Sequence, residues 1–179
     1  RYDSELPAVA SWTDAMAFCQ WLGEMSGRPV TLPTEAQWEY AARARGQTLR
    51  YATRNGKAEA GITMAPKPPS RRYDEAPKEE PLPNPPGTFP PNPIGLYDMS
   101  GNVGEWVRDY YREDYYENSP VQNPQGPETG LELTFEGITD THRVQRGGNY
   151  RDFIGNTTVT RRKGVPRLSS QQSGFRCAY

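Results

Sequence analysis

Residues 11–43 read SWTDAMAFCQWLGEMSGRPVTLPTEAQWEYAAR and contain the two clearest helix signals of the 179-residue chain. Ser11 stands three residues before Asp14, and Thr34 stands three residues before Gln37. A hydroxyl followed at that distance by an acid or an amide is typical of a capping box, which satisfies the free N–H groups at the start of a helix. We therefore expect two short amphipathic helices in this stretch.

Apolar residues at helical spacing predict the buried face of each helix. In the first helix, which we expect to end at Gly27, they are Ala15, Phe18, Cys19, Leu22 and Met25. In the second helix they are Trp38, Ala41 and Ala42.

The composition limits the class of fold. The chain holds 17 Gly and 18 Pro, together about a fifth of its residues, and only 34% of it is apolar. Proline removes a helix hydrogen bond and glycine costs helix entropy, so a coiled coil or a plain helical bundle is excluded. The Gly-x-y repeat of collagen is absent from the sequence, and no apolar run approaches the length of a membrane span. We expect a loop-rich fold with a modest core.

The charges are nearly balanced, with 21 basic and 22 acidic residues and a net charge of −1. Binding to nucleic acid usually requires a basic excess, so nucleic acid is not expected as a partner. The sequence starts at Arg1 without initiator Met, signal peptide or anchor, which we interpret as a mature or trimmed chain.

Beyond the helices the sequence changes in character. Residues 66–93 contain 11 of the 18 prolines, a composition that favours extended or disordered backbone. We interpret them as a surface excursion from one domain spanning 1–179, rather than as a linker between two domains or a strip that binds a partner. Residues 94–179 are rich in aromatic and β-branched residues, and we expect short strands such as Val144–Gln145 and Thr157–Thr160. The whole pattern predicts an α+β fold.

Histidine and cysteine are scarce. His142 is the single histidine, so this chain alone lacks the ligands of a two-histidine iron site or a His-rich zinc site. The sequence has no nucleophile elbow to support a catalytic triad, and we expect His142 in a surface loop before a strand. Cys19 and Cys177 are either two buried thiols or a bridge that closes nearly the whole chain, and their spacing does not choose between these.

The densest group of candidate ligands lies in residues 97–106, which read YDMSGNVGEW. This segment holds two carboxylates and an asparagine between glycines, and hard cations bind several oxygens of this kind. The residues alone are equally consistent with a calcium site and with a hydrogen-bonded turn. An aromatic and charged stretch follows, which suits either recognition of a partner or ordinary loop packing. Its tyrosines are Tyr110, Tyr111, Tyr115 and Tyr116.

Six blocks of sequence occur along nearly the whole chain. They are WTDA and AFCQWL within 12–22, LPTEAQWEYAAR at 32–43, GLYDMSGNV at 95–103, EWV at 105–107, RV and RGGNY within 143–150, and GFRCA at 174–178. Together, in this order, they resemble the formylglycine-generating enzyme family, also called sulfatase-modifying factors. The resemblance implies a variant of the C-type lectin fold with two short helices, short antiparallel strands and many loops. The family's N-terminal block, a Gly-Gly-x-Phe-x-Met-Gly segment, is missing from the sequence.

Family members that make formylglycine bind copper with two cysteines placed after the Arg-Gly-Gly block. The matching residues here are Asp152 and Thr157. Copper(I) prefers thiolates, so neither copper nor formylglycine formation is expected. The catalytic residues stay unknown, and Asp152 with Arg151, Arg161 and Arg162 is the first group to test.

The resemblance also implies a disulfide. In vertebrate-type members a disulfide joins the residues that match Cys19 and Cys177. A second one joins the residues that match Ala42 and Arg162, and this chain lacks both of its halves. We therefore expect a Cys19–Cys177 bridge, which indicates a periplasmic or extracellular location.

The family further binds calcium through the segment 97–106. Carried over to this chain, the ligands are the side chains of Asp98 and Glu105 and the backbone carbonyls of Gly101 and Val103. Another calcium site of the family falls in the region 55–90, where this sequence departs too far to align.

Two functions follow from the resemblance. The first is a bacterial envelope protein that acts as a maturation enzyme or oxidative tailoring factor on a peptide or peptide-derived substrate. It would be similar to the pyoverdine-maturation proteins, which act on a siderophore precursor. The alternative is a non-catalytic module that binds a protein partner in a secretion or motility apparatus. Iron enzymes that share the domain take histidine ligands from another domain, and a diversified retroelement-type protein would carry more Asn and Tyr in 149–172.

Overall fold

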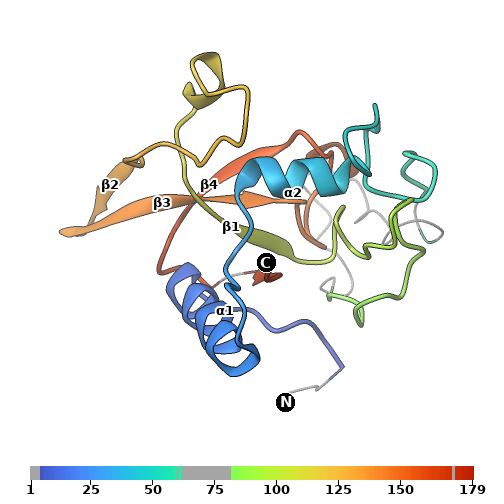
Figure 1. Ribbon diagram of the computed structural model, residues 1–179, viewed down its shortest axis with the longest axis horizontal. Helices are drawn as coiled ribbons and strands as arrows, with labels where there is room; N and C mark the ends of the chain where they lie inside the picture. The colour runs from blue at the N-terminus through green and yellow to red at the C-terminus, as the bar shows by residue number, and fades with distance from the viewer. Residues whose placement is uncertain (1–4, 60, 62–81, 171) are drawn as a thin grey trace, which may run out of the picture.

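The computed structural model describes residues 5–59, 61, 82–170 and 172–179. Two α-helices come first along the chain, α1 (Trp12–Ser26) and α2 (Glu35–Ala42). The strands are β1 (Gly104–Tyr110), β2 (Glu132–Phe135), β3 (Ile138–Arg146), β4 (Arg162–Pro166) and β5 (Ser173–Phe175), with short 3-10 helices at Tyr115–Glu117 and Ile154–Asn156 (Figure 1). The expected α+β class is confirmed.

The strand β3 is the centre of a five-stranded sheet. Its first half pairs with β2, and its second half pairs with β1 and β4, always antiparallel. In contrast to the antiparallel strands expected from the sequence, β5 pairs with β1 in parallel, so the sheet is mixed. Parallel neighbours need a long connection, and the chain from β1 to β5 passes through β2, β3 and β4.

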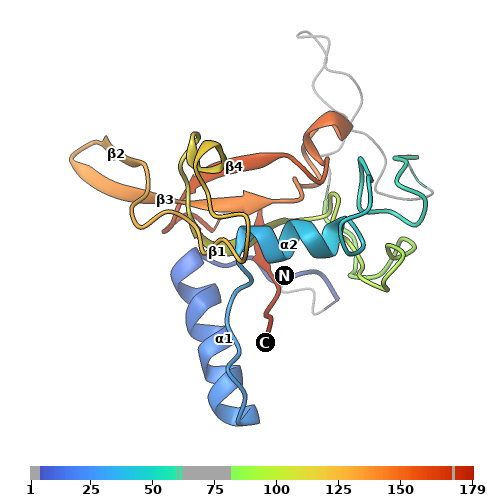
Figure 2. The same cartoon turned by 45° about the horizontal axis from the view of Figure 1, so that its top comes forward.

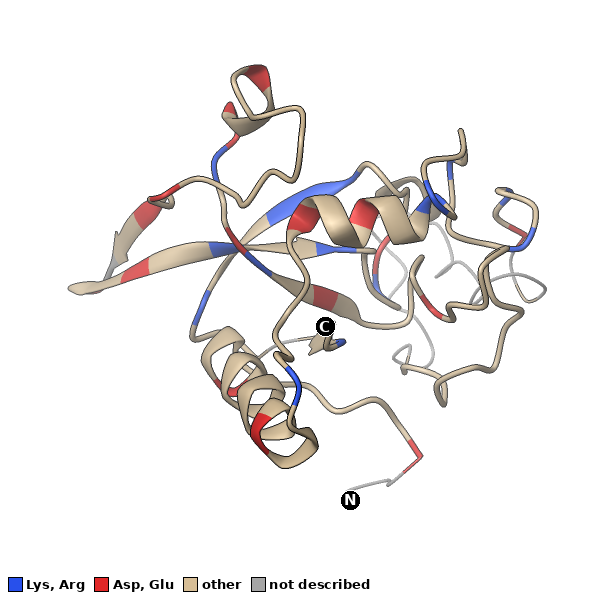
Figure 3. Cartoon of the chain, in the orientation of Figure 1, with Lys and Arg blue, Asp and Glu red and all other residues tan. Residues whose placement is uncertain are grey.

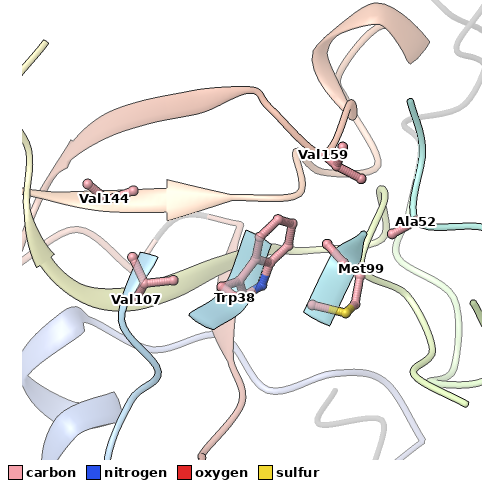
Figure 4. Packing of buried hydrophobic residues seen from close by; sticks show 7 residues of the cluster. Trp38, Ala52, Met99, Val107, Val144 and Val159 are labelled. Atoms are coloured by element: carbon pink, nitrogen blue, oxygen red, sulfur yellow. The ribbon is translucent and has the colours of Figure 1, made fainter. Parts of the chain in front are cut away.

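The helix α2 covers one face of this sheet. It contributes to a buried apolar cluster of Trp38, Ala42, Ala52, Met99, Val107, Val144 and Val159 (Figure 4). The helix α1 lies beside β1, apart from α2 (Figure 2), and packs against the opposite face of the sheet. It belongs to a second cluster of Ala15, Cys19, Leu32, Trp106 and Val165. Consecutive side chains of a strand point to opposite faces, so Trp106 and Val107 of β1 each reach one cluster.

Both helix starts are capped as predicted. The Ser11 hydroxyl accepts a hydrogen bond from the backbone N–H of Asp14 at 3.1 Å. Thr34 and Gln37 form the complete capping box of α2. Gly27 ends α1 in the left-handed conformation, with φ 66°.

The predicted buried face of α1 is partly wrong. Three of its five residues are at least one-third exposed, namely Phe18, Leu22 and Met25. Gly23 is buried on this helix instead, and a Cβ there would lie 2.8 Å from the carbonyl oxygen of Arg28. The chain that leaves α1 therefore packs closely against Gly23. Because apolar residues lie on more than one side of α1, their spacing did not define the buried side.

One of the two predicted strands is corrected. Val144–Gln145 lies within β3 as expected, but Thr157–Thr160 is not a strand. It lies in a turn after the 3-10 helix, and the next strand starts at Arg162. Thr157 and Val159 are nevertheless buried, so their β-branched side chains fill core positions from irregular backbone.

The expected surface position of His142 is also wrong. It lies inside β3, opposite Pro166 of β4, and is only 8% exposed. The strand begins at Ile138, earlier than the sequence indicated.

The proline-rich segment 66–93 is described only in its last part. Residues 82–93 contain neither helix nor strand, and the earlier part of the predicted excursion lies outside the described residues.

Within the described part of the chain, no helix has the length and apolar character needed to cross a membrane.

Candidate functional site

A small polar pocket lies beside the loop that follows β3. Its volume is about 110 Å³, and it is lined by Gln145, Gly148, Asp152, Asn156, Arg161 and Lys163. One carboxylate, two side-chain amides and two cations therefore surround the same small space. Such a lining is suited to a polar or charged group.

Two features of the backbone form this pocket. The register of β3 and β4 places Gln145 opposite Lys163. Gly147 and Gly148 then turn the chain with φ of 83° and 69°, values that favour glycine. A Cβ at Gly148 would also lie 2.8 Å from the carbonyl oxygen of Asn156. The turn therefore has no room for a larger residue.

Asp152 and Thr157, which match the family's copper-binding cysteines, have different surroundings. The carboxylate of Asp152 lines the pocket and accepts a hydrogen bond from the Asn149 N–H at 2.9 Å. Thr157 is 4% exposed, and its hydroxyl donates to the carbonyl oxygen of Ile154 at 2.9 Å. Both side chains offer oxygen rather than sulfur, and the hydroxyl is already bonded within its own loop. These two residues do not fit copper(I).

The cations of the pocket differ from their neighbour in sequence. Arg161 and Lys163 are exposed, and neither has an acidic partner among the residues that the structure describes. Arg162, between them, is directed to the other face of the sheet and forms an ion pair with Glu35 at 2.7 Å. Arg151 does not line the pocket, and its guanidinium lies 5.6 Å from the ring centre of Tyr150.

A group of buried ion pairs holds β3 and β4 against α2, and we call it the Glu35 cluster. It consists of Glu35, Glu39, Arg146 and Arg162. In Figure 3, acidic positions colour α2 and basic positions colour the neighbouring strands β3 and β4. Arg146 bonds Glu35 at 2.5 Å and Glu39 at 2.6 Å. Burial opposes the charge of Arg162, but the hydrogen bonds and charge of Glu35 outweigh it and raise the pKa of Arg162. The cluster fixes the two strands whose opposite side forms the polar pocket.

A larger cavity of about 620 Å³ lies elsewhere, next to the 97–106 segment. Most of its lining is apolar and includes Phe18, Leu22, Leu96 and Phe175. The predicted calcium ligands Asp98 and Glu105 both line it, together with Arg176 and Cys177.

The carboxylates of this cavity are already engaged by protein groups. Glu105 accepts from the Trp38 indole N–H at 2.6 Å and from the Arg176 Nε at 2.7 Å, with a second bond from the same guanidinium. Asp98 accepts from the Gly87 N–H at 2.7 Å. Burial raises the pKa of Asp98, and the nearby charge of Glu105 adds to that effect.

The donor types in this loop fit calcium, because carboxylates and carbonyls are its usual ligands. Asp98 and Asn102 have positive φ of 59° and 64°, so the chain curls tightly between the two acids. A cation beside Asp98 would relieve the repulsion from Glu105. The Glu105 carboxylate is already paired with Arg176, so a cation that binds Glu105 would share this carboxylate with the guanidinium. Among the described residues, no group of three or more His, Cys, Asp or Glu is gathered to hold a metal, so backbone carbonyls such as those of Gly101 and Val103 would have to complete the shell.

Cys19 and Cys177 form a disulfide with a Cα–Cα distance of 5.6 Å. The bridge joins the middle of α1 to the residue after Arg176, at the wall of the larger cavity. The pairing is the one that the resemblance implied.

The tyrosine stretch forms the end of β1 and the loop beyond it. Tyr110 and Tyr111 are half-buried, and Tyr116 is 42% exposed. The guanidinium of Arg162 lies 4.8 Å from the ring centre of Tyr116, so this tyrosine covers the Glu35 cluster. Burial raises the pKa of Tyr116, and the negative charge of Glu35 acts in the same direction.

Among the polar side chains of the pocket, those of Gln145, Asn156 and Lys163 were not predicted from the sequence. The alternation along β4 could have separated Lys163 from Arg162, had the strand been located correctly. The meeting of Lys163 with Asp152 depends on the pairing of β3 with β4, which no local signal reveals.

The fold and the Arg-Gly-Gly loop define a protein of the formylglycine-generating enzyme class, as expected. The sulfatase-modifying factor enzyme 1-like domain family matches residues 1–179, so the chain belongs to this family.

Among its relatives is the formylglycine-generating enzyme of Streptomyces coelicolor, 35% identical over 177 residues, which cover 94% of this chain and 50% of that enzyme. The serine/threonine-protein kinase pkn1 of Chlamydia pneumoniae is 33% identical over 94% of this chain and 23% of its own length. The chain thus spans about half or less of the curated relatives it matches. The solved structure of PvdO from Pseudomonas aeruginosa has a TM-score of 0.67 and 26% identity, covering 97% of this chain and 61% of PvdO.

Proposed function

We propose that this protein is a maturation enzyme or oxidative tailoring factor of the bacterial envelope that acts on a peptide or peptide-derived substrate and does not generate formylglycine. The observation that carries this proposal is the polar pocket. Its carboxylate, Asp152, stands where formylglycine-forming members carry a copper-binding cysteine. The resemblance to pyoverdine-maturation proteins supports a role other than formylglycine formation.

Within this proposal Asp152 accepts a proton from the part of the substrate that adjoins the group held in the pocket. Its hydrogen bond from Asn149 holds the carboxylate in place, and it is the only acid in the lining. None of the six lining residues has a redox-active side chain, so an oxidative reaction would need an electron acceptor from outside, such as dioxygen.

The envelope location rests on the disulfide, because such bonds persist in oxidising compartments.

Calcium at Asp98 and Glu105 is proposed as a structural ion of the 97–106 segment. Adding calcium to chelator-treated protein should raise its melting temperature, and Asp98→Asn should abolish the rise. Asp140→Asn, which removes a carboxylate paired with Arg167 outside the 97–106 segment, serves as the control.

The test of function compares culture extracts of a deletion strain and complemented strains by mass spectrometry. The deletion should accumulate a precursor that is two hydrogen atoms heavier than the mature product, and wild-type protein should remove it. Asp152→Asn should fail to do so, whereas the exposed control Asp114→Asn should succeed. Full complementation by Asp152→Asn would reject the proposal.

Formylglycine formation is checked separately. A Cys-x-Pro-x-Arg peptide incubated with this protein, copper and oxygen should show no mass change, while the Streptomyces coelicolor enzyme serves as the positive control. Turnover by this protein would contradict the argument from Asp152 and Thr157.

One observation favours the alternative of a binding module. The side of α1 that does not face the sheet carries exposed apolar residues, including Trp21 (53%) and Met25 (70%). Under this alternative, no precursor accumulates in the deletion strain. Replacing Trp21 and Met25 by polar residues would then disturb assembly of the partner complex, whereas Asp152→Asn would not.

A further inference from the structure

We propose that the pocket beside Asp152 binds a carboxylate of the substrate, through Arg161 and Lys163. The inference rests on the proposed function only in taking the bound group to belong to a substrate. It assigns the chemistry that the pocket selects, namely a peptide or peptide-derived molecule with a single negative charge at the bound end.

The charge of the pocket supports a monoanion. Arg161 and Lys163 provide two positive charges, and Asp152 provides one negative charge. The net charge of the lining is therefore positive by one, which a carboxylate would balance. A phosphate dianion would exceed that charge.

The two cations are available for a ligand. Neither forms an ion pair with an acid in the described part of the chain, in contrast to Arg162 between them, which is bound to Glu35. Strand alternation explains the difference between Arg162 and Lys163, because neighbouring residues of β4 point to opposite faces of the sheet. Arg161, directly before the strand, lines the same pocket as Lys163. The Glu35 cluster therefore holds β4 in place from behind without consuming the charges at the front.

The size of the pocket fits the tip of a small acid. A volume of about 110 Å³ corresponds to roughly three or four water molecules at about 30 Å³ each. This is enough for a carboxylate and an adjoining methylene. The remainder of the substrate would lie outside, which agrees with the exposed positions of Arg161 and Lys163.

The amides complete the recognition site. Gln145 is buried, and its Nε2 donates to the Ser173 hydroxyl at 2.6 Å, so the orientation of its side chain is fixed. Gly104 lies directly against it, and a Cβ there would be 2.4 Å from the Gln145 Cδ. Asn156 supplies a second amide to the lining. A carboxylate in the pocket would thus meet the charged donors of Arg161 and Lys163 and, in addition, a side-chain amide.

The experiment measures binding without turnover, by nuclear magnetic resonance on the full chain. The reporters are the side-chain amides of Gln145 and Asn156 and the backbone amide of Gly148. The probes are acetyl-trialanine with a free carboxylate, acetyl-trialanine amide, the internal-acid peptide acetyl-Ala-Glu-Ala amide with its Gln counterpart, and inorganic phosphate. Shifts with acetyl-trialanine would indicate that the pocket binds a C-terminal carboxylate. Shifts with the internal-acid peptide would indicate that it binds a side-chain carboxylate.

We expect at least one carboxylate probe to shift the three reporters with millimolar affinity and its neutral counterpart to leave them unchanged. Arg161→Gln and Lys163→Gln should each weaken binding about fivefold, the effect of one charge pair near the surface. Arg54→Gln removes the same charge at an exposed position outside the pocket and should have no effect. Asp152→Asn should tighten binding, because it removes the opposing charge while keeping an oxygen for the Asn149 N–H.

Equal shifts with the acid and amide peptides would overturn the inference. So would an equal loss of affinity in Arg54→Gln and the two pocket variants, or tighter binding of phosphate than of either acid peptide. Carboxylate binding combined with full complementation by Asp152→Asn would support this inference and reject the proposed function alone. Loss of the mass-spectrometric activity in Asp152→Asn without any carboxylate binding would reject the inference alone.

Discussion

The two helices are held to the same sheet by different chemistry. On one face, α1 is joined to the end of the chain by the Cys19–Cys177 disulfide and packs through an apolar cluster. On the other face, α2 is held by the Glu35 cluster, in which two acids of the helix meet Arg146 and Arg162 from the strands. One attachment is covalent and insensitive to protonation, and the other depends on charge.

The difference follows from what each helix offers to the sheet. The buried side of α1 is made of small residues and Cys19, so the chain approaches closely and a covalent bridge can span the contact. The N-terminus of α2 places Glu35 in a fully buried position, where a carboxylate needs partners to offset its desolvation. The resemblance assigned a second disulfide of vertebrate-type relatives to Ala42 and Arg162. In this chain Arg162 makes an ion pair to the same helix instead.

The largest effect is expected from breaking the covalent attachment. Replacing both Cys19 and Cys177 by alanine should lower the free energy of unfolding by about 5 kcal/mol, because a bridge across 158 residues restricts the unfolded chain strongly in the chain-entropy model. Urea denaturation of the variant, beside wild-type protein with and without reductant, measures this loss. An unchanged unfolding midpoint after reduction would show that α1 is held by packing alone.

The next effect concerns the ionic attachment. Glu35→Gln should lower the free energy of unfolding by about 3–4 kcal/mol, because it leaves Arg146, a fully buried cation, and Arg162 short of a partner. Glu39→Gln is the matched control on the same helix. The Glu39 side chain is 27% exposed, so we expect a loss of only about 1 kcal/mol. If the two variants lose equal stability, burial is not what makes the Glu35 cluster strong.

A smaller effect depends on pH and again concerns the α2 side. Asp109 of β1 is 3% exposed and accepts a hydrogen bond from the Glu35 N–H at 2.8 Å. Burial raises the pKa of Asp109 to about 6, and the charge of Glu35 adds to the rise. Between pH 4 and 6 the folded protein therefore holds a proton that the unfolded chain has released. Linkage then requires that the contribution of Asp109 to stability falls as the pH rises through this interval.

The variant Asp109→Asn keeps an oxygen acceptor and removes the titration. Its advantage in the free energy of unfolding over wild type should grow from pH 4 to pH 7 and reach at most about 3 kcal/mol, since one pKa unit corresponds to about 1.4 kcal/mol. Urea denaturation at four pH values gives the difference curve, in which the titrations of other acids cancel. A constant difference across this range would contradict the assigned pKa. The disulfide variant should retain the wild-type pH dependence in this interval.

How much the sequence could predict also differs between the two faces. Both helix starts and the end of α1 were predicted correctly because caps are local signals, as at Ser11, Thr34 and Gly27. The buried side of α1 was predicted only in part, because apolar side chains such as Phe18 line a cavity rather than the core. The strand predicted at Thr157–Thr160 failed because Val159 is buried by turns around it.

The candidate sites were predicted only as far as single positions. Matching to the family assigned Asp152 and Thr157, but their separation became visible only in three dimensions, with one side chain in the pocket and the other bonded to Ile154. The pairing of Arg162 with Glu35 spans 127 positions of sequence. Ion pairs of that range depend on the register of the sheet, and no short-range pattern encodes them.

The smallest effect compares the caps of the two helices. Ser11→Ala and Thr34→Ala each remove a hydroxyl that accepts a backbone N–H at 3.1 Å, a loss of about 1 kcal/mol in each helix. Thr34→Ala should cost more, because Thr34 is 2% exposed against 8% for Ser11, and removing its methyl group as well as its hydroxyl leaves a gap in a buried position. Fraying at Thr34 would also loosen Glu35, the next residue, and with it the Glu35 cluster. Denaturation of the Thr34 variant in the Glu35→Gln background should therefore reveal a coupling energy, whereas Ser11→Ala combined with Glu35→Gln should be additive. Additivity in both pairs would mean that the ionic attachment of α2 does not depend on how its helix begins.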